Sequence, residues 1–167
     1  MDSDSLLTIA ELAVGLIGVS GIVVVFMSRD GIDPVDRMRF VLLLTNGMVV
    51  AVAAFIPIWI AHFVENLQTV WRLSSACGFA LALPIAAIVL KHQNSLPAWK
   101  SSRAEMASLF RNGPWVLAGV GFLLPSFNIL AWPIAPNQAL YEAALIATLI
   151  QVSLFFAELA IYPSRVR

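Results

Sequence analysis

Two carboxylates lie inside long apolar stretches of this sequence, where a charge is costly. Glu11 occurs in the stretch AELAVGLIGVSGIVVVF, and Glu158 occurs near the end of another apolar run. An ionisable side chain in hydrocarbon surroundings has to be neutral, paired or in contact with water, and it often marks the route of an ion or a solute. Glu11 and Glu158 are therefore the first candidates for function.

Three side-chain amides also occur within apolar runs: Asn46, Asn128 and Gln151. Gln151 shares a helical face with Glu158, because the two residues are seven positions apart. Two roles are open for the amides: they line a hydrated path together with the carboxylates, or they hydrogen-bond neighbouring helices. The second role has a specific cause, since three prolines each leave a backbone carbonyl without its helical donor: Pro57, Pro84 and Pro125.

Each carboxylate also has a structural explanation. Arg72 occurs near the start of the third apolar run, so an ion pair between Glu11 and Arg72 is one hypothesis. A position of Glu11 at the membrane interface is another. For Glu158 the alternative to a hydrated route is an ion pair with an arginine near the same membrane boundary, such as Arg39.

Small residues share the helical faces of these polar groups. Gly15 and Gly18 follow Glu11 by four and seven residues, which places them on one side of a helix. In lipid, small side chains let two helices approach closely, and the resulting packing replaces the hydrophobic drive that water supplies. The partner is another helix of the same chain or a second copy. The predicted packing residues are Gly15, Gly18, Gly21, Ala144 and Ala147.

Composition identifies the elements that position these residues. Of the 167 residues, 60% are hydrophobic and only 12% are charged, and the mean hydropathy is +0.87. These values are typical of a membrane protein. A spanning helix needs about 20 apolar residues, so we predict an all-α integral membrane protein, one domain over residues 1–167, with transmembrane helices at 6–28, 38–63, 70–90, 114–135 and 140–162.

Signals at the ends of these runs support the boundaries. Asp33 is predicted to cap the second helix with Pro34 in its first turn, and the motif RNGP predicts the start of the fourth helix at Pro114. Tryptophan and tyrosine favour the two membrane interfaces. We expect Trp59, Trp71, Trp132 and Tyr141 at the outer interface, and Trp99, Trp115 and Tyr162 at the inner one.

The distribution of positive charge predicts the orientation. Nine of the ten lysines and arginines occur around the first and third connections and in the C-terminal tail, which leaves only Arg72 on the other side. The positive-inside rule then places the N-terminus outside and the C-terminus in the cytoplasm. The acidic MDSDS segment lacks the basic region of a signal peptide, so we expect the first helix to be retained.

The third connection contains an amphipathic pattern at residues 97–111. Trp99, Met106 and Phe110 share a face with Arg103 beside them, while Lys100 faces away. This pattern predicts a short helix lying in the inner lipid interface, with a solvated loop as the alternative.

Several classes of function are not expected. The single cysteine, Cys77, excludes an intramolecular disulfide, and His62 and His92 fall at opposite membrane faces, so they cannot bind one haem or zinc together. We find no phosphate-binding glycine motif, no nucleophile elbow and no basic aromatic surface for nucleic acid. The sequence therefore predicts no catalytic residues, no cofactor and no metal.

Two functions remain. The first is a homo-oligomeric protein of a bacterial-type plasma (inner) membrane that conducts or transports an ion or small solute along a path lined by Glu11, Asn46, Asn128, Gln151 and Glu158. The second is a non-catalytic structural, sensing or accessory subunit with a membrane-protein partner. A polar cavity that reaches the carboxylates favours the first function, and dry, paired carboxylates favour the second.

Overall fold

The computed structural model describes residues 2–27, 33–94 and 108–161. These residues form five α-helices and no strand: α1 (Ser3–Met27), α2 (Pro34–Ile60), α3 (Leu67–Asn94), α5 (Ser108–Leu130) and α6 (Gln138–Ile161). Each is long and apolar enough to cross a membrane. The predicted all-helical, multi-pass class is therefore confirmed.

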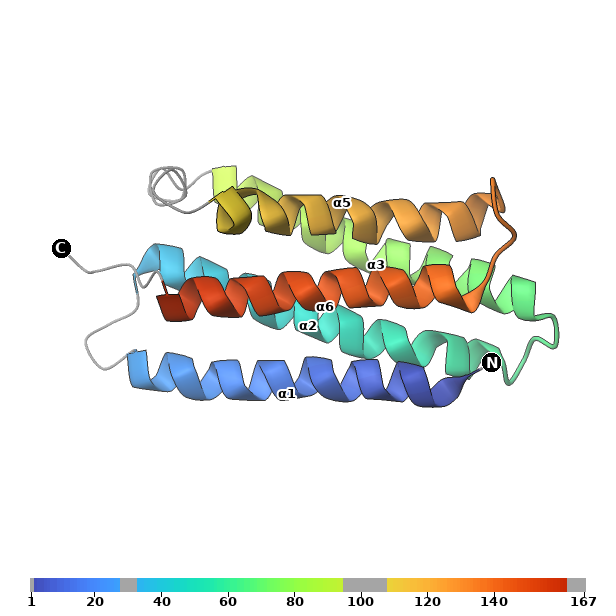
Figure 1. Ribbon diagram of the computed structural model, residues 1–167, viewed down its shortest axis with the longest axis horizontal. Helices are drawn as coiled ribbons and strands as arrows, with labels where there is room; N and C mark the ends of the chain where they lie inside the picture. Colours follow the sequence, from blue (N-terminus) through green and yellow to red (C-terminus); the bar gives the residue numbers. More distant parts are fainter. Residues whose placement is uncertain (1, 28–32, 95–107, 162–167) are drawn as a thin grey trace.

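The helices run alternately up and down in one bundle (Figure 1). We call the end where α1, α3 and α6 begin the N-terminal end, and the end where α2 and α5 begin the opposite end. Helices α2 and α6 are central, because they pack against each other and each of them also packs against at least two further helices. On one side α1 packs against both, and on the other side α3 packs on α2 while α5 packs on α6 and α3.

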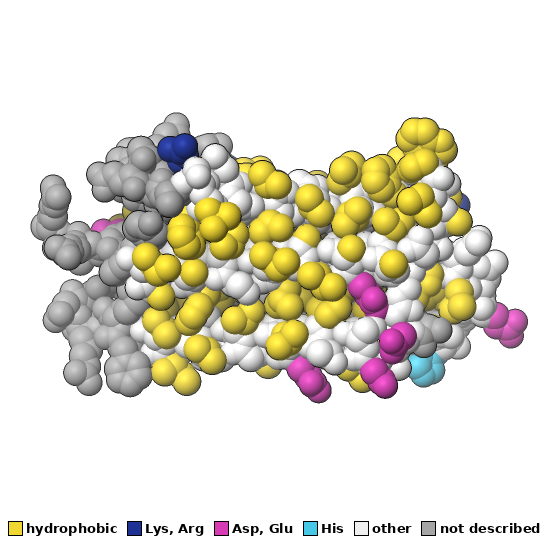
Figure 2. Space-filling model, in the orientation of Figure 1, with side chains coloured by type: hydrophobic (Ala, Val, Ile, Leu, Met, Phe, Trp, Pro, Cys, Tyr) yellow, Lys and Arg dark blue, Asp and Glu magenta, His cyan; other side chains and the backbone are white. Residues whose placement is uncertain are grey.

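The sides of the bundle are apolar. Large hydrophobic side chains are exposed along all five helices, as expected for surfaces that face lipid. In the face seen in Figure 2 these side chains extend along the molecule, whereas most of the acidic side chains lie toward the N-terminal end.

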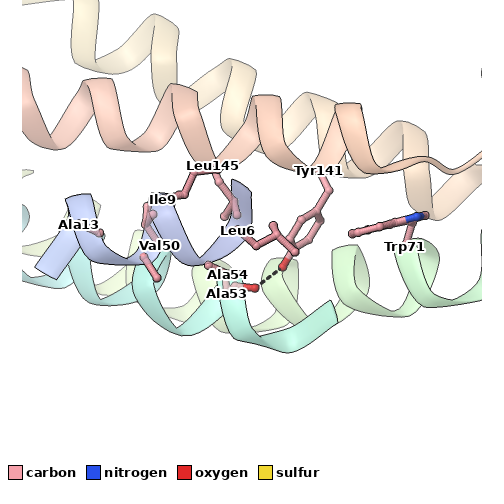
Figure 3. Packing of buried hydrophobic residues seen from close by; sticks show 10 residues of the cluster. Leu6, Ile9, Ala13, Val50, Ala53, Ala54, Trp71, Tyr141 and Leu145 are labelled. Atoms are coloured by element: carbon pink, nitrogen blue, oxygen red, sulfur yellow. Dashed lines mark hydrogen bonds between the residues drawn. The ribbon is translucent and has the colours of Figure 1, made fainter. Parts of the chain in front are cut away.

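Two apolar clusters hold the central helices together. At the N-terminal end, Leu6 and Ile9 of α1 pack with Val50 of α2 and Leu145 of α6 (Figure 3). At the opposite end, α2 and α6 pack through a second cluster around Leu42, Leu43, Val152, Phe155 and Leu159. Close packing of this kind stabilises helix pairs in lipid through van der Waals contact.

The beginning of α2 matches its prediction. Asp33 is the N-cap, its side chain accepts a hydrogen bond from the backbone N–H of Val35 at 2.8 Å, and Pro34 is in the first turn. This arrangement satisfies one of the free N–H groups at the helix start, and proline removes another.

The predicted start of α5 at Pro114 is wrong. Helix α5 begins at Ser108, so Pro114 lies inside it. The extra turns are supported by contact with α6: a Cβ atom at Gly113 would be 3.1 Å from Leu154 Cδ1, so the two helices are already close there. Phe110 therefore belongs to α5 and not to a separate interfacial helix. The rest of that predicted helix, with Trp99, Lys100, Arg103 and Met106, lies outside the described residues.

Two of the aromatic residues expected at the interface are in the core. Trp71 and Tyr141 are buried, with ring centroids 5.9 Å apart. Both belong to the cluster at the N-terminal end, where their rings fill space between α3, α6 and α2. Trp59 and Trp132 are exposed, and their position at the outer interface stays a prediction.

Tyr141 is also held in the core by a hydrogen bond of its hydroxyl group to α2. Pro57 lies inside α2 and has no N–H for the carbonyl four residues earlier, which is that of Ala53. The hydroxyl of Tyr141 donates a hydrogen bond to this carbonyl oxygen at 2.7 Å (Figure 3). A side chain of α6 thus replaces the donor that proline removed from α2.

Candidate functional site

A cavity of about 320 Å³ lies among α2, α3, α5 and α6. Its lining extends from Gln93, in the last turn of α3, to Val49, Phe122 and Thr148 near the middle of their helices. It therefore occupies the half of the bundle nearer the opposite end. The volume falls within the range of small-ligand sites.

Among the described lining residues, the amide and hydroxyl side chains are those of Asn46, Gln93, Thr148 and Gln151. Two of them are partly engaged within their own helices. Asn46 Nδ2 donates to the carbonyl of Leu42 at 2.8 Å, and Thr148 Oγ1 donates to that of Ala144 at 2.9 Å. The side-chain oxygens of Asn46 and Thr148 keep acceptor capacity for another group.

Gln93 and Gln151 differ from those two. Their exposed fractions are 4% and 8%, and neither side chain has a hydrogen bond to another residue in the described part of the chain. A buried amide without a partner is destabilising, so such a group normally binds water or a ligand. Because both side chains line the cavity, their amide groups are free to bond a molecule inside it.

A second, smaller cavity of about 60 Å³ continues toward the N-terminal end. The two cavities share lining residues on four helices, among them Val49, Ala82 and Phe122. At this junction α5 and α6 approach closely, since a Cβ at Gly121 would be 3.0 Å from Thr148 Oγ1, and both residues line both cavities. The space therefore narrows toward the middle of the bundle.

Asn128 joins helices beyond the second cavity. Its Nδ2 donates to Ser75 Oγ of α3 at 3.1 Å and to the Asn137 carbonyl at 3.2 Å, and its Oδ1 accepts from the Asn137 backbone N–H at 3.0 Å. Asn128 is fully buried and lines neither cavity. Its amide thus has the interhelical role that the sequence left open as the alternative to a path.

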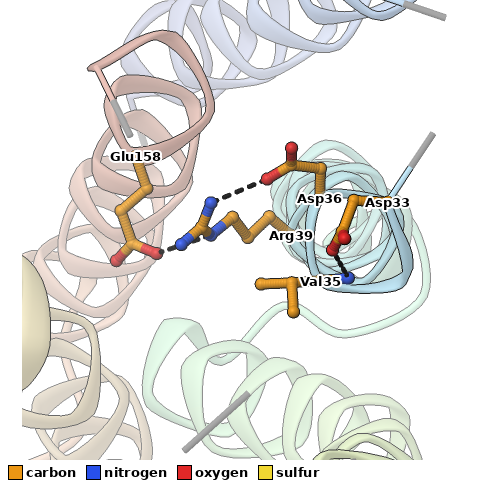
Figure 4. A network of polar contacts seen from close by, with 5 residues as sticks. All are labelled: Asp33, Val35, Asp36, Arg39 and Glu158. Carbon is orange, nitrogen blue, oxygen red and sulfur yellow. Dashed lines mark hydrogen bonds and ion pairs between the residues drawn. The ribbon is translucent and has the colours of Figure 1, made fainter. Parts of the chain in front are cut away.

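Glu158 takes part in a buried ionic cluster at the opposite end (Figure 4). Arg39 Nη1 is 2.7 Å from Asp36 Oδ1, and Arg39 Nε is 3.7 Å from Glu158 Oε2. The exposed fractions of Arg39 and Glu158 are 1% and 0%. The ion pair with Arg39 that the sequence offered as an alternative for Glu158 is present, and Glu158 lines neither cavity.

Glu11 lies on the exposed face of α1, away from the cavity. Arg72 is also exposed, and the ion pairs among the described residues do not include either side chain. The structure thus does not bring Glu11 and Arg72 together. It brings together two of the five predicted path residues, Asn46 and Gln151, at one cavity.

The glycines beside Glu11 are open as well. A Cβ atom at Gly15, Gly18 or Gly21 would meet no atom of the described chain within 4 Å. None of the described helices therefore covers this stripe. The packing residues of α6 behave differently, because Ala144 and Ala147 are buried inside the bundle.

Sequence reasoning missed Gln93, because the third helix was expected to end at residue 90. It continues to Asn94. With that extension Gln93 follows Val89, Ala86 and Ala82 by four, seven and eleven residues, so all four lie on one face, and all four line the cavity. The helical period could have identified this residue had the span been continued past Lys91.

The described residues contain no group of three His, Cys, Asp or Glu side chains that could hold a metal ion. What the cavity offers is hydrogen bonding within apolar walls. No protein-family model, curated protein or solved structure matches the chain.

Proposed function

We propose that this chain is a non-enzymatic, multi-pass membrane protein that carries a small solute through the amide-lined space among α2, α3, α5 and α6. The observation that supports this most is the main cavity with its narrower continuation toward the N-terminal end. The path residues of this proposal are Asn46 and Gln151 of the original set, joined by Gln93 and Thr148. Neither Glu11 nor Glu158 lines these cavities, so the path proposed here is formed by amides and not by carboxylates.

Self-association is part of the proposal. The face of α1 that carries Glu11, Gly15 and Gly18 is exposed and has no neighbour within the described chain. A small-residue stripe with a polar side chain suits close contact with a second α1 in lipid, where a bare carboxylate is costly. The proposed location is a bacterial-type inner membrane, with the N-terminal end outside.

Flux measurement tests transport. The purified chain is reconstituted into liposomes, and permeation of protons, potassium and uncharged solutes such as glycerol and urea is compared with empty liposomes. Ala82 lines both cavities, so Ala82→Leu is expected to narrow the connection and to reduce flux. Ala80→Leu is the matched control, because Ala80 is exposed on the same helix. Equal flux in protein-containing and empty liposomes would contradict transport.

The second candidate is a non-catalytic accessory or sensing subunit. The buried Arg39 cluster favours it, because Glu158 is held by an ion pair and does not line a path. In that case the reconstituted chain shows no flux, and purification from native membranes recovers it with a partner membrane protein. A pure homo-oligomer with solute flux would contradict this alternative.

A further inference from the structure

We infer that the main cavity binds an uncharged amphiphile whose polar group both donates and accepts hydrogen bonds. Such a ligand is a primary amide or an alcohol with an apolar body of about ten carbons. This inference rests on the cavity named under the proposed function, but it does not require that the ligand is transported.

The described lining of the cavity carries no charge, which disfavours a charged ligand. Among the described residues that line the cavity, none is acidic, basic or histidine. The nearest buried charges on α2 and α6 are Arg39 and Glu158, which are paired with each other and lie outside the lining. A charged ligand would therefore lose its hydration without gaining a counter-charge, which is strongly unfavourable in apolar surroundings.

The amide side chains in the cavity favour a ligand that both donates and accepts hydrogen bonds. The side chains of Gln93 and Gln151 are more than nine-tenths buried, line the cavity and have no partner among the described residues. Each offers two N–H donors and one carbonyl acceptor. Asn46 has used one of its two N–H donors within its helix and keeps the other together with its carbonyl oxygen, whereas Thr148 has used its only donor and adds an acceptor. A ligand that only accepts, such as a ketone, would leave acceptors in the cavity without a donor.

The walls of the cavity favour a ligand with an apolar body. Most lining residues are apolar, and Val89, Trp115, Phe122 and Phe155 contribute bulky surface from three helices. Gln93 is in the last turn of α3, whereas Asn46 and Gln151 lie roughly ten residues inside their helices, about 15 Å along the axis. Apolar side chains separate these two depths. A ligand whose polar group bonds Gln151 can extend its apolar body along these walls, whereas water alone would leave the apolar wall unfilled.

Binding by a matched series of compounds tests the inference. The full chain in detergent or nanodiscs is titrated with decanamide, with 2-undecanone as the acceptor-only analogue, and with decanoate and decylammonium as charged analogues. Bound molecules per chain are counted by native mass spectrometry. We expect saturable binding of one decanamide, at least tenfold tighter than that of the other three. Equal retention of the ketone, or tighter binding of a charged analogue, overturns the inference.

Variants separate the cavity from the lipid-facing surface. Gln151→Leu is expected to weaken decanamide binding at least tenfold, whereas Gln68→Leu, the same change at an exposed site of α3, leaves it unchanged. Ala118→Leu fills the cavity and should weaken binding even if Gln151→Leu does not fold. Unchanged binding in every correctly folded cavity variant contradicts the site.

The result is independent of the flux assay. Decanamide binding without flux in liposomes supports the inference and contradicts the proposed transport. Solute flux without decanamide binding does the reverse.

Discussion

At the scale of single residues, the hydrogen bond from Tyr141 to Ala53 shows how a helix break is compensated in lipid. Proline removes a backbone donor, and water is not available in the membrane interior to replace it. The phenol of α6 supplies the missing donor at 2.7 Å. The same bond fixes α6 against α2, so the break in one helix becomes a specific contact between two.

A double-mutant cycle tests this compensation. Tyr141→Phe removes only the hydroxyl and should lower the free energy of unfolding by about 1 kcal/mol. In a Pro57→Ala background the backbone N–H of the introduced alanine can bond the Ala53 carbonyl, so the same change should cost much less. Unfolding in mixed micelles measures both values. An equal cost of Tyr141→Phe in the two backgrounds would contradict the assignment.

The Arg39 cluster leads to a second prediction about single residues. Arg39 is completely buried with Asp36 and Glu158 beside it. Arg39→Met leaves both carboxylates in a buried site without this cation, so we expect a loss of about 3–5 kcal/mol. Adding Glu158→Gln removes one of the stranded charges and should restore part of the stability.

The neighbouring arginine provides the control. Arg37 is exposed on the same turn of α2, so Arg37→Met should change stability by less than about 1 kcal/mol. The denaturant midpoint of each variant is compared in the same micelles. If Arg39→Met and Arg37→Met have equal effects, the buried cluster does not stabilise the fold.

At the scale of helices, α1 has two faces with opposite roles. The inner face packs on α2, where a Cβ at Gly47 would be 2.7 Å from Ile17 Cγ1. The outer face carries Gly15 and Gly18 with open space around them. The absence of a side chain at Gly47 therefore permits contact within the chain, and the absence of side chains on the outer face leaves room for contact with another molecule.

The same substitution at Gly47 of α2, which contacts the inner face of α1, and at Gly18, on the outer face of α1, distinguishes these roles. Gly47→Leu collides with Ile17 and should destabilise the fold by about 1–3 kcal/mol, with partial recovery when Ile17 is replaced by Ala. Gly18→Leu meets no neighbour in the chain, so folding should be unchanged while the mass in nanodiscs shifts to smaller species. Thermal melting and mass photometry measure the two effects. A smaller mass for Gly47→Leu alone would contradict the proposed α1 contact.

The sequence predicted the helices well because their signals are local. Apolar length and the Asp33–Pro34 cap specified α2 to within a few residues. The predicted start of α5 at Pro114 was wrong. The RNGP motif suggests a cap, whereas contact of Gly113 with Leu154 of α6 supports a longer helix. That contact joins residues distant in sequence, which no local pattern reports.

At the scale of the whole molecule, α2 and α6 separate a closely packed side from a cavity side. With α1 they form a tightly packed group, and with α3 and α5 they line the cavity. Sequence patterns identified Asn46 and Gln151 as polar residues in apolar helices. They could not show that these two face one cavity while Asn128 and Glu158 are engaged elsewhere, because helical periodicity defines faces and not which faces meet.

Cysteine labelling tests the orientation of the bundle. In a Cys77→Ala background, single cysteines are introduced at Glu65, in the connection between α2 and α3, and at Asn112, near the start of α5. Both positions are exposed, and they lie at opposite ends of the bundle. The positive-inside rule predicts that an impermeant thiol reagent added to intact cells modifies Glu65→Cys and leaves Asn112→Cys unmodified until the membrane is opened.

The charges behind this expectation are unevenly placed. Among the described residues, the opposite end carries Arg37, Lys91 and Arg111 on exposed positions, whereas the N-terminal end carries Arg72. Lysine and arginine resist translocation far more than acidic residues promote it, so the basic count decides the direction. Labelling of Asn112→Cys in intact cells, with Glu65→Cys protected, would reverse the orientation. The main cavity, which lies nearer the opposite end, would then be nearer the outside than the cytoplasm.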